Sequence, residues 1–126
     1  MKKEILSLLF LAALFLGSLY NIRFLDSLTD ELTSYIDSAE KFAADDDFEN
    51  AVSEAEKALE KWAGMDFYTH IFISHDEIDE TTDAFCEFLG DLYSGDSSSA
   101  RGSALKIRAH LTSIASSEHL KLGSIL

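Results

Sequence analysis

Apolar residues recur every three or four positions through most of the chain after residue 27, which is the spacing of one face of an α-helix. No proline interrupts the pattern. Helices joined by short connections usually pack antiparallel to their neighbours. The sequence therefore predicts an all-α fold with a small antiparallel four-helix domain. The four apolar stripes are Leu28, Leu32, Tyr35, Ala39 and Phe42; Phe48, Val52, Ala55, Leu59 and Trp62; Ile78, Thr82, Phe85, Leu89 and Leu92; and Ala100, Ala104, Ile107, Leu111 and Ile114.

Short polar stretches separate the predicted helices. "ADDDF" at 44–48 offers aspartates that can cap the second helix, and "YSGDSSS" at 93–99 has the composition of a turn. "MDFYTHIFI" at 65–73 is expected to be an aromatic connector. The closing "SEHLKLGSIL" at 117–126 is expected to fold back on the domain.

The first two dozen residues have no polar face. Lys2 and Lys3 precede a run without charge from Ile5 to Tyr20, or to Ile22 if the next two residues are included. This length falls between a signal-peptide core and a full membrane span of about 20 residues. Bulky residues at position −3 of the candidate cleavage sites favour an uncleaved anchor over a removed signal peptide. We expect residues 1–23 to be this anchor and residues 24–126 to form the helical domain.

Charge predicts the orientation of this anchor. Positive residues before a span stay in the cytoplasm, so Lys2 and Lys3 place the domain on the outer side of the cytoplasmic membrane. The domain is acidic and its charge is uneven. Residues 24–96 contain 21 Asp and Glu against 3 Lys and Arg, whereas residues 97–126 contain 1 against 4. Such a surface repels phosphates, which argues against nucleic-acid binding.

The stretch "FISHDEIDETTDAF" at 72–85 concentrates the candidate chemistry. Ser74 and Glu77 have the spacing of a capping box, and the acids of the following turns suit a helix N-terminus. The acidic stripe Asp76, Glu80, Asp83, Glu87 and Asp91 is expected to face solvent, like Asp26, Asp30, Asp37 and Glu40 in the first helix.

His75 continues the apolar stripe toward the helix start, so we expect a structural histidine shielded by Trp62, Phe67 or Phe72. A metal site could be drawn from His70, His75 and Asp79. Zinc, however, usually takes three or four nitrogen or sulfur ligands, and no metal motif surrounds these residues. No nucleophile elbow or phosphate loop is present. We therefore expect no catalytic residue, no bound metal and no cofactor, and no enzyme activity.

The chain resembles DUF4363, an uncharacterised family of membrane-anchored helical proteins of Firmicutes. The resemblance lies in the lysine-led span, in Trp62 at the end of a charged helix, in the block "FYTHIFISHDEID" at 67–79, and in the closing "LGSIL". It implies a structural block comprising Trp62, Phe67, Phe72, His75, Asp76, Glu77, Ile78 and Asp79. It also implies a membrane-protein partner and no known activity.

Three functions from different classes remain. The first is a membrane-tethered interaction or structural module of the cell envelope, held in the bilayer by residues 5–22. The second is a secreted module that binds cations through its acidic stripes, and the third is a metalloenzyme centred on His75. The oligomeric state is left open.

Overall fold

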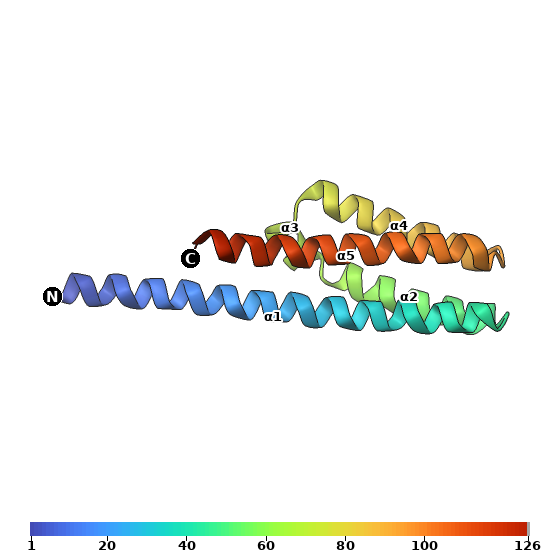
Figure 1. The fold of residues 1–126 in the computed structure, drawn as a ribbon, viewed down its shortest axis with the longest axis horizontal. Coiled ribbons are helices and arrows are strands. Elements are labelled where there is room, and N and C mark those ends of the chain that lie inside the picture. The colour runs from blue at the N-terminus through green and yellow to red at the C-terminus, as the bar shows by residue number, and fades with distance from the viewer. Residues whose placement is uncertain (126) are drawn as a thin grey trace.

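The described part of the chain consists of five α-helices and their short connections (Figure 1). The computed structural model describes residues 1–125, with the side chains of Phe67, Phe72, Lys121, Leu122, Ser124 and Ile125 left out. Within that part of the chain the secondary structure is helical, without strands, which confirms the all-α prediction. The helices are α1 (Lys2–Ala44), α2 (Phe48–Gly64), α3 (Asp66–Phe72), α4 (His75–Tyr93) and α5 (Ser97–Ile125).

Helix α1 has an exposed N-terminal part and a C-terminal part that packs against other helices. Its N-terminal part extends beyond all the other helices, and its buried residues begin at Ile22 (Figure 1). An 18-residue window in α1 has a mean hydropathy of 2.1 and is 6% buried. Among the described helices α1 alone is long and apolar enough to cross a membrane, a property that signal sequences share. The helix runs without a break through residue 23, where the sequence suggests a boundary between anchor and domain.

The core lies between the four longer helices. α1 packs against α2 and α5, and α4 packs against the same two helices. From α1 and α5 come branched aliphatic side chains, while α2 supplies small residues that allow close approach, and α4 supplies Phe85 and Phe88. Members of all four predicted stripes are buried, including Leu28, Leu32 and Ala39; Ala55 and Trp62; Ile78, Phe85 and Leu92; and Ala100, Ala104, Ile107, Leu111 and Ile114.

Side chains cap the starts of three helices. Asp47 accepts a hydrogen bond from the amide of Asn50, and Ser74 accepts one from the amide of Glu77. Asp96 accepts from the amide of Ser99, and this bond lowers the pKa of its carboxyl. These bonds satisfy amides that have no partner within the helix. The predictions that an aspartate of 44–48 caps the second helix and that Ser74 caps α4 are therefore confirmed. The Glu77 carboxylate lies against α5 rather than completing a capping box with Ser74.

Two segments differ from the sequence expectations. The aromatic connector contains a helix, α3, and the closing segment does not fold back but continues α5 as a helix to Ile125. This last part of α5 reaches α1, where the His119 ring nitrogen Nε2 lies 3.2 Å from a carboxylate oxygen of Asp26. Polar side chains at the end of α5 therefore contact α1 while α5 stays helical.

Candidate functional site

The start of α4 presents its acidic residues on two different faces. Asp76, Asp79 and Asp83 are exposed and point outward. Glu80 and Glu87 of the predicted stripe are also exposed, as expected, but they approach side chains of α5. Asp91 is partly buried against α5, and Glu77, outside the stripe, faces α5 as well. The pairs show that α4 and α5 are antiparallel, because residues later in α4 pair with residues earlier in α5. The pairs are Asp91 with Ser103, Glu87 with Lys106, Glu80 with His110, and Glu77 with Ser113.

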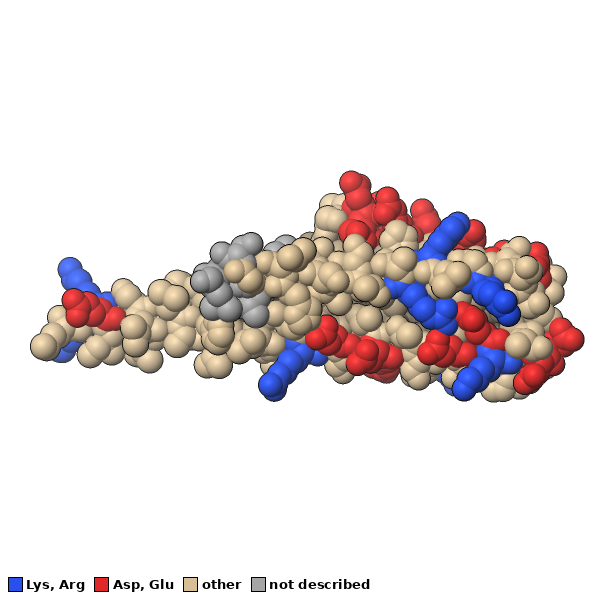
Figure 2. Space-filling model, in the orientation of Figure 1, with Lys and Arg blue, Asp and Glu red and all other residues tan. Residues whose placement is uncertain are grey.

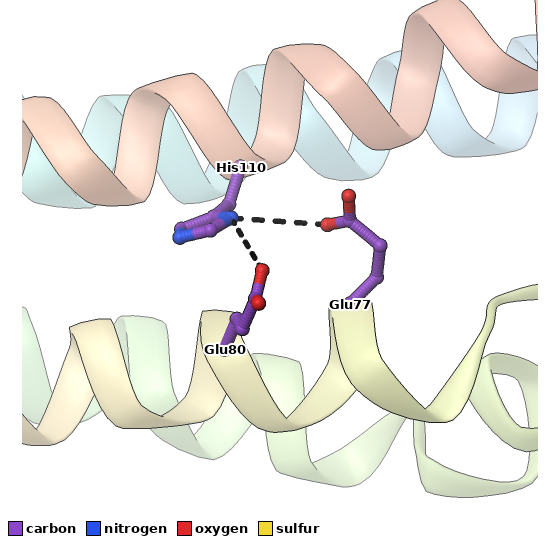
Figure 3. Close-up of side chains that lie close together, drawn as sticks. All are labelled: Glu77, Glu80 and His110. Atoms are coloured by element: carbon purple, nitrogen blue, oxygen red, sulfur yellow. Dashed lines mark ion pairs between the residues drawn. The ribbon is translucent and has the colours of Figure 1, made fainter.

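Glu77, Glu80 and His110 converge across the contact between α4 and α5 (Figure 3). The two glutamates are three positions apart and therefore share one face of α4. The His110 nitrogen Nδ1 lies 3.8 Å from Oε2 of Glu77 and 4.0 Å from Oε2 of Glu80. In the part of the chain that the structure describes, this is the group of three potential metal ligands whose ligand atoms all lie within 4.8 Å of one another.

The Glu77 carboxylate has an unusual environment. Its Oε2 atom is shielded from solvent and accepts no hydrogen bond from the described residues. Its other oxygen, Oε1, lies 3.4 Å from the hydroxyl of Ser113, a long contact for a hydrogen bond. None of the ion pairs between described residues joins a lysine or an arginine to Glu77 or Glu80. Water can compensate the exposed Glu80 carboxylate, whereas the shielded oxygen of Glu77 faces the His110 ring.

Two basic side chains of α5, Lys106 and Arg108, form ion pairs with carboxylates other than Glu77 and Glu80. Lys106 Nζ lies 3.1 Å from a carboxylate oxygen of Glu87 on α4. Arg108 contacts two carboxylates of α1, at 2.5 Å to Asp37 and 2.6 Å to Glu40. Partial burial lowers the pKa of Arg108, but the bonds to these carboxylates outweigh it and raise the pKa above its ordinary value. Lys106 and Arg108 thus neutralise carboxylates within the fold.

The residues suggested by the sequence for a metal site do not come together as one group. His70 Nε2 lies 3.1 Å from an Asp66 oxygen, and the His70 ring lies 5.2 Å from the ring of His75. Asp79 is exposed on the outward face of α4. Among the described residues, His70, His75 and Asp79 are not a set with converging ligand atoms.

The expectation that His75 is shielded was wrong. His75 is the first residue of α4 and is exposed, whereas burial on this helix begins at Ile78. The core reaches back only to Ile78, so the part of the apolar stripe before it lies outside the protein interior. Trp62 is buried, with its ring centroid 6.1 Å from that of Phe85. The side chains of Phe67 and Phe72 lie outside the described part of the structure.

Another polar cluster lies where α1 leaves the other helices. The Tyr68 hydroxyl donates to the side-chain oxygen of Asn21, whose amide donates to Glu118 at 3.0 Å. Burial and the nearby Glu118 charge raise the pKa of Tyr68 to about 12, against the smaller opposing effect of the bond to Asn21. Beside it lies a largely apolar cavity of about 280 Å³ lined by Gly17, Tyr20, Asn21, Phe24 and Tyr68.

Comparison with known proteins identifies the family of this fold. A family model described as a domain of unknown function, DUF4363, matches residues 19–125. The chain belongs to the DUF4363 family. In this DUF4363 chain the match covers α1 from residue 19 onward and all of α2 to α5, and it includes Glu77, Glu80 and His110. No curated protein and no solved structure matches it.

Proposed function

We propose that this DUF4363 protein is tethered to the cytoplasmic membrane by the start of α1 and acts outside it as a binding module, without catalytic activity. The observation that supports this most is the uncovered apolar part of α1. Ile5, Leu8, Phe10, Leu11 and Leu16 are exposed, each by more than 60%. A surface of this kind is unfavourable in water and favourable in a bilayer.

The length of this segment suits a membrane. Residues 5–22 would be about 27 Å long at 1.5 Å per residue, close to the roughly 30 Å of a hydrocarbon core. Lys2 and Lys3 open α1, and Figure 2 shows basic side chains at the tip of the projecting end. Tyr20, Phe24 and Tyr68 lie at the other end of the segment, and such aromatic residues are common at membrane interfaces. The lysines favour a cytoplasmic N-terminus and an outer helical domain.

The outer part of the proposal is an antiparallel four-helix bundle. Three features support it: the contacts of α1 and α4 with both α2 and α5, the short connections at 45–47 and 94–96, and the opposite directions of α4 and α5 in their cross-helix pairs. Such a body is rigid enough to present a fixed surface to a partner.

That surface is acidic. Figure 2 shows carboxylates gathered over the broad body of the molecule and nearly absent from its projecting end. On α5, Lys106 pairs with Glu87 and Arg108 pairs with two carboxylates of α1. Asp76, Asp79 and Asp83 on α4 are instead exposed and in no ion pair between described residues. We call these three residues the outward carboxylates. They support docking to a basic surface, and the family resemblance suggests a membrane protein as the partner.

Capture of partners from solubilised native membranes tests this proposal. The bait is the full-length chain, compared with a variant in which the outward carboxylates become Asn and with a control in which Asp45, Asp46 and Glu49 become Asn, Asn and Gln. We expect a stoichiometric partner that the control retains and the variant loses, and that dissociates at high salt because screening weakens exposed charge contacts. Equal capture by both variants would contradict the proposed docking face.

A further inference from the structure

The contact between α4 and α5 has the features of a metal site rather than of a simple ion pair. Glu77, Glu80 and His110 direct two carboxylates and one imidazole nitrogen toward a common point (Figure 3). Oε2 of Glu77 is shielded from water and receives no hydrogen bond from the described residues. A shielded carboxylate oxygen without a donor is unfavourable, whereas a cation bound beside it would compensate its charge. We propose that these three residues bind one divalent transition-metal ion of the zinc class.

The donor set favours this class of metal, because zinc also accepts carboxylate oxygen and His110 supplies one nitrogen ligand. Calcium and magnesium prefer oxygen ligands only, whereas imidazole nitrogen together with carboxylate oxygen suits zinc and its first-row neighbours. Three protein ligands leave a fourth tetrahedral position for water or for a side chain of a partner. Glu77 and Glu80 come from one helix and His110 from another, so a bound ion would also join α4 to α5.

The observed distances require only a small adjustment. Ligand atoms about 2.0–2.2 Å from a tetrahedral zinc ion lie roughly 3.3–3.6 Å from one another. Nδ1 of His110 is 3.8 Å from the Glu77 oxygen and 4.0 Å from the Glu80 oxygen. The Glu80 side chain is 64% exposed and can change rotamer, which would bring its carboxylate closer to the other two ligands.

A protonated His110 is the alternative explanation for the cluster. An imidazolium that held both carboxylates would be expected to donate a hydrogen bond to one of them at about 2.7–2.9 Å. The distances from Nδ1 are longer than a hydrogen bond to either glutamate. The surrounding charge also favours a divalent ion, because Asp76, Asp79 and Asp83 follow the same helix and the described residues place no lysine or arginine against Glu77 or Glu80.

Metal titration of the full-length chain in detergent tests the proposal. The protein is first stripped with a chelator, and zinc is then added while calorimetry records binding and thermal unfolding is followed by circular dichroism. We expect one zinc ion per chain and a rise in Tm with zinc. Calcium at the same concentration and ionic strength should give neither. Failure to bind zinc stoichiometrically would overturn the proposal.

Three matched variants locate the ion. Glu80→Gln and His110→Gln should each weaken zinc affinity by at least about tenfold, since even the loss of groups that only support metal ligands costs 10- to 100-fold. Asp79→Asn removes one charge from the same helix outside the site and should lower affinity far less than the loss of a ligand does. Because Glu80 is exposed, Glu80→Gln is expected to fold normally, which its circular dichroism spectrum checks. Equal weakening by Asp79→Asn, or retained affinity in Glu80→Gln, would contradict the site.

Discussion

The contact between Trp62 and Thr82 joins α2 to α4 and permits a direct test of the packing. The indole Nε1–H donates to the Thr82 hydroxyl at 3.0 Å, and Trp62 is 4% exposed. Thr82→Val keeps the branched shape of the side chain but removes the acceptor. A buried donor left without a partner costs about 1–3 kcal/mol. Thr82 is partly exposed and admits some water, so we expect a loss in the lower half of this range, about 1–2 kcal/mol.

The assay is urea unfolding of the full-length chain in detergent, followed by far-UV circular dichroism. Thr82→Ser is one control, because it keeps the hydroxyl and loses one partly buried methyl group, at a cost below about 0.8 kcal/mol. Trp62→Phe is the other, because it removes the donor. In that background Thr82→Val should change the free energy of unfolding by less than about 0.5 kcal/mol, since no donor is left unsatisfied. An equal loss in both backgrounds would refute the hydrogen bond as the cause.

Three further outcomes follow from the contacts described above. Arg108→Gln should lower the free energy of unfolding by about 1–3 kcal/mol in urea melts, because Glu40 has a shielded oxygen that faces this cation, whereas the exposed Lys106→Gln should cost under about 1 kcal/mol; equal costs would contradict this. The raised pKa of Tyr68, about 12, means that its stabilising contribution is complete below its ordinary pKa of 10.0 and is lost as pH rises toward 12. Melts of Tyr68→Phe at increasing pH should lack that component, and an unchanged pH dependence would contradict it. His75→Ala should alter stability by less than about 0.5 kcal/mol because the residue is exposed, and a loss above about 1 kcal/mol would show a buried role.

The periodic part of the fold was predictable because burial follows the helical repeat. Ala100, Ala104, Ile107, Leu111 and Ile114 are all buried, as their spacing indicates. The capping aspartate and serine residues were also predictable, since their side chains act on amides three positions away. Both the buried positions and the caps depend on residues three or four positions apart, so they can be predicted without the neighbouring helices.

The candidate site was not predictable in the same way. His110 is 30 residues beyond Glu80, and nothing in its own segment marks it as a partner. Its position follows from the turn at 94–96, which fixes how far along α5 each residue of α4 finds its neighbour. That register could have indicated the contact once both helices were placed antiparallel. The exposure of His75 depended on where the core ends, which the periodicity of one helix does not specify.

The central claim is that residues 5–22 stay in the membrane and the acidic domain lies outside it. Cys86 is the only cysteine and is exposed, so it can report the location of the domain. Intact protoplasts are treated with a membrane-impermeant maleimide, and the membrane pellet and supernatant are analysed by intact-protein mass spectrometry, with Cys86→Ser as the control. We predict full-length protein in the pellet, near 14.0 kDa plus one adduct. Labelling only after lysis, or a labelled species in the supernatant lacking about the first 20 residues, would contradict the account.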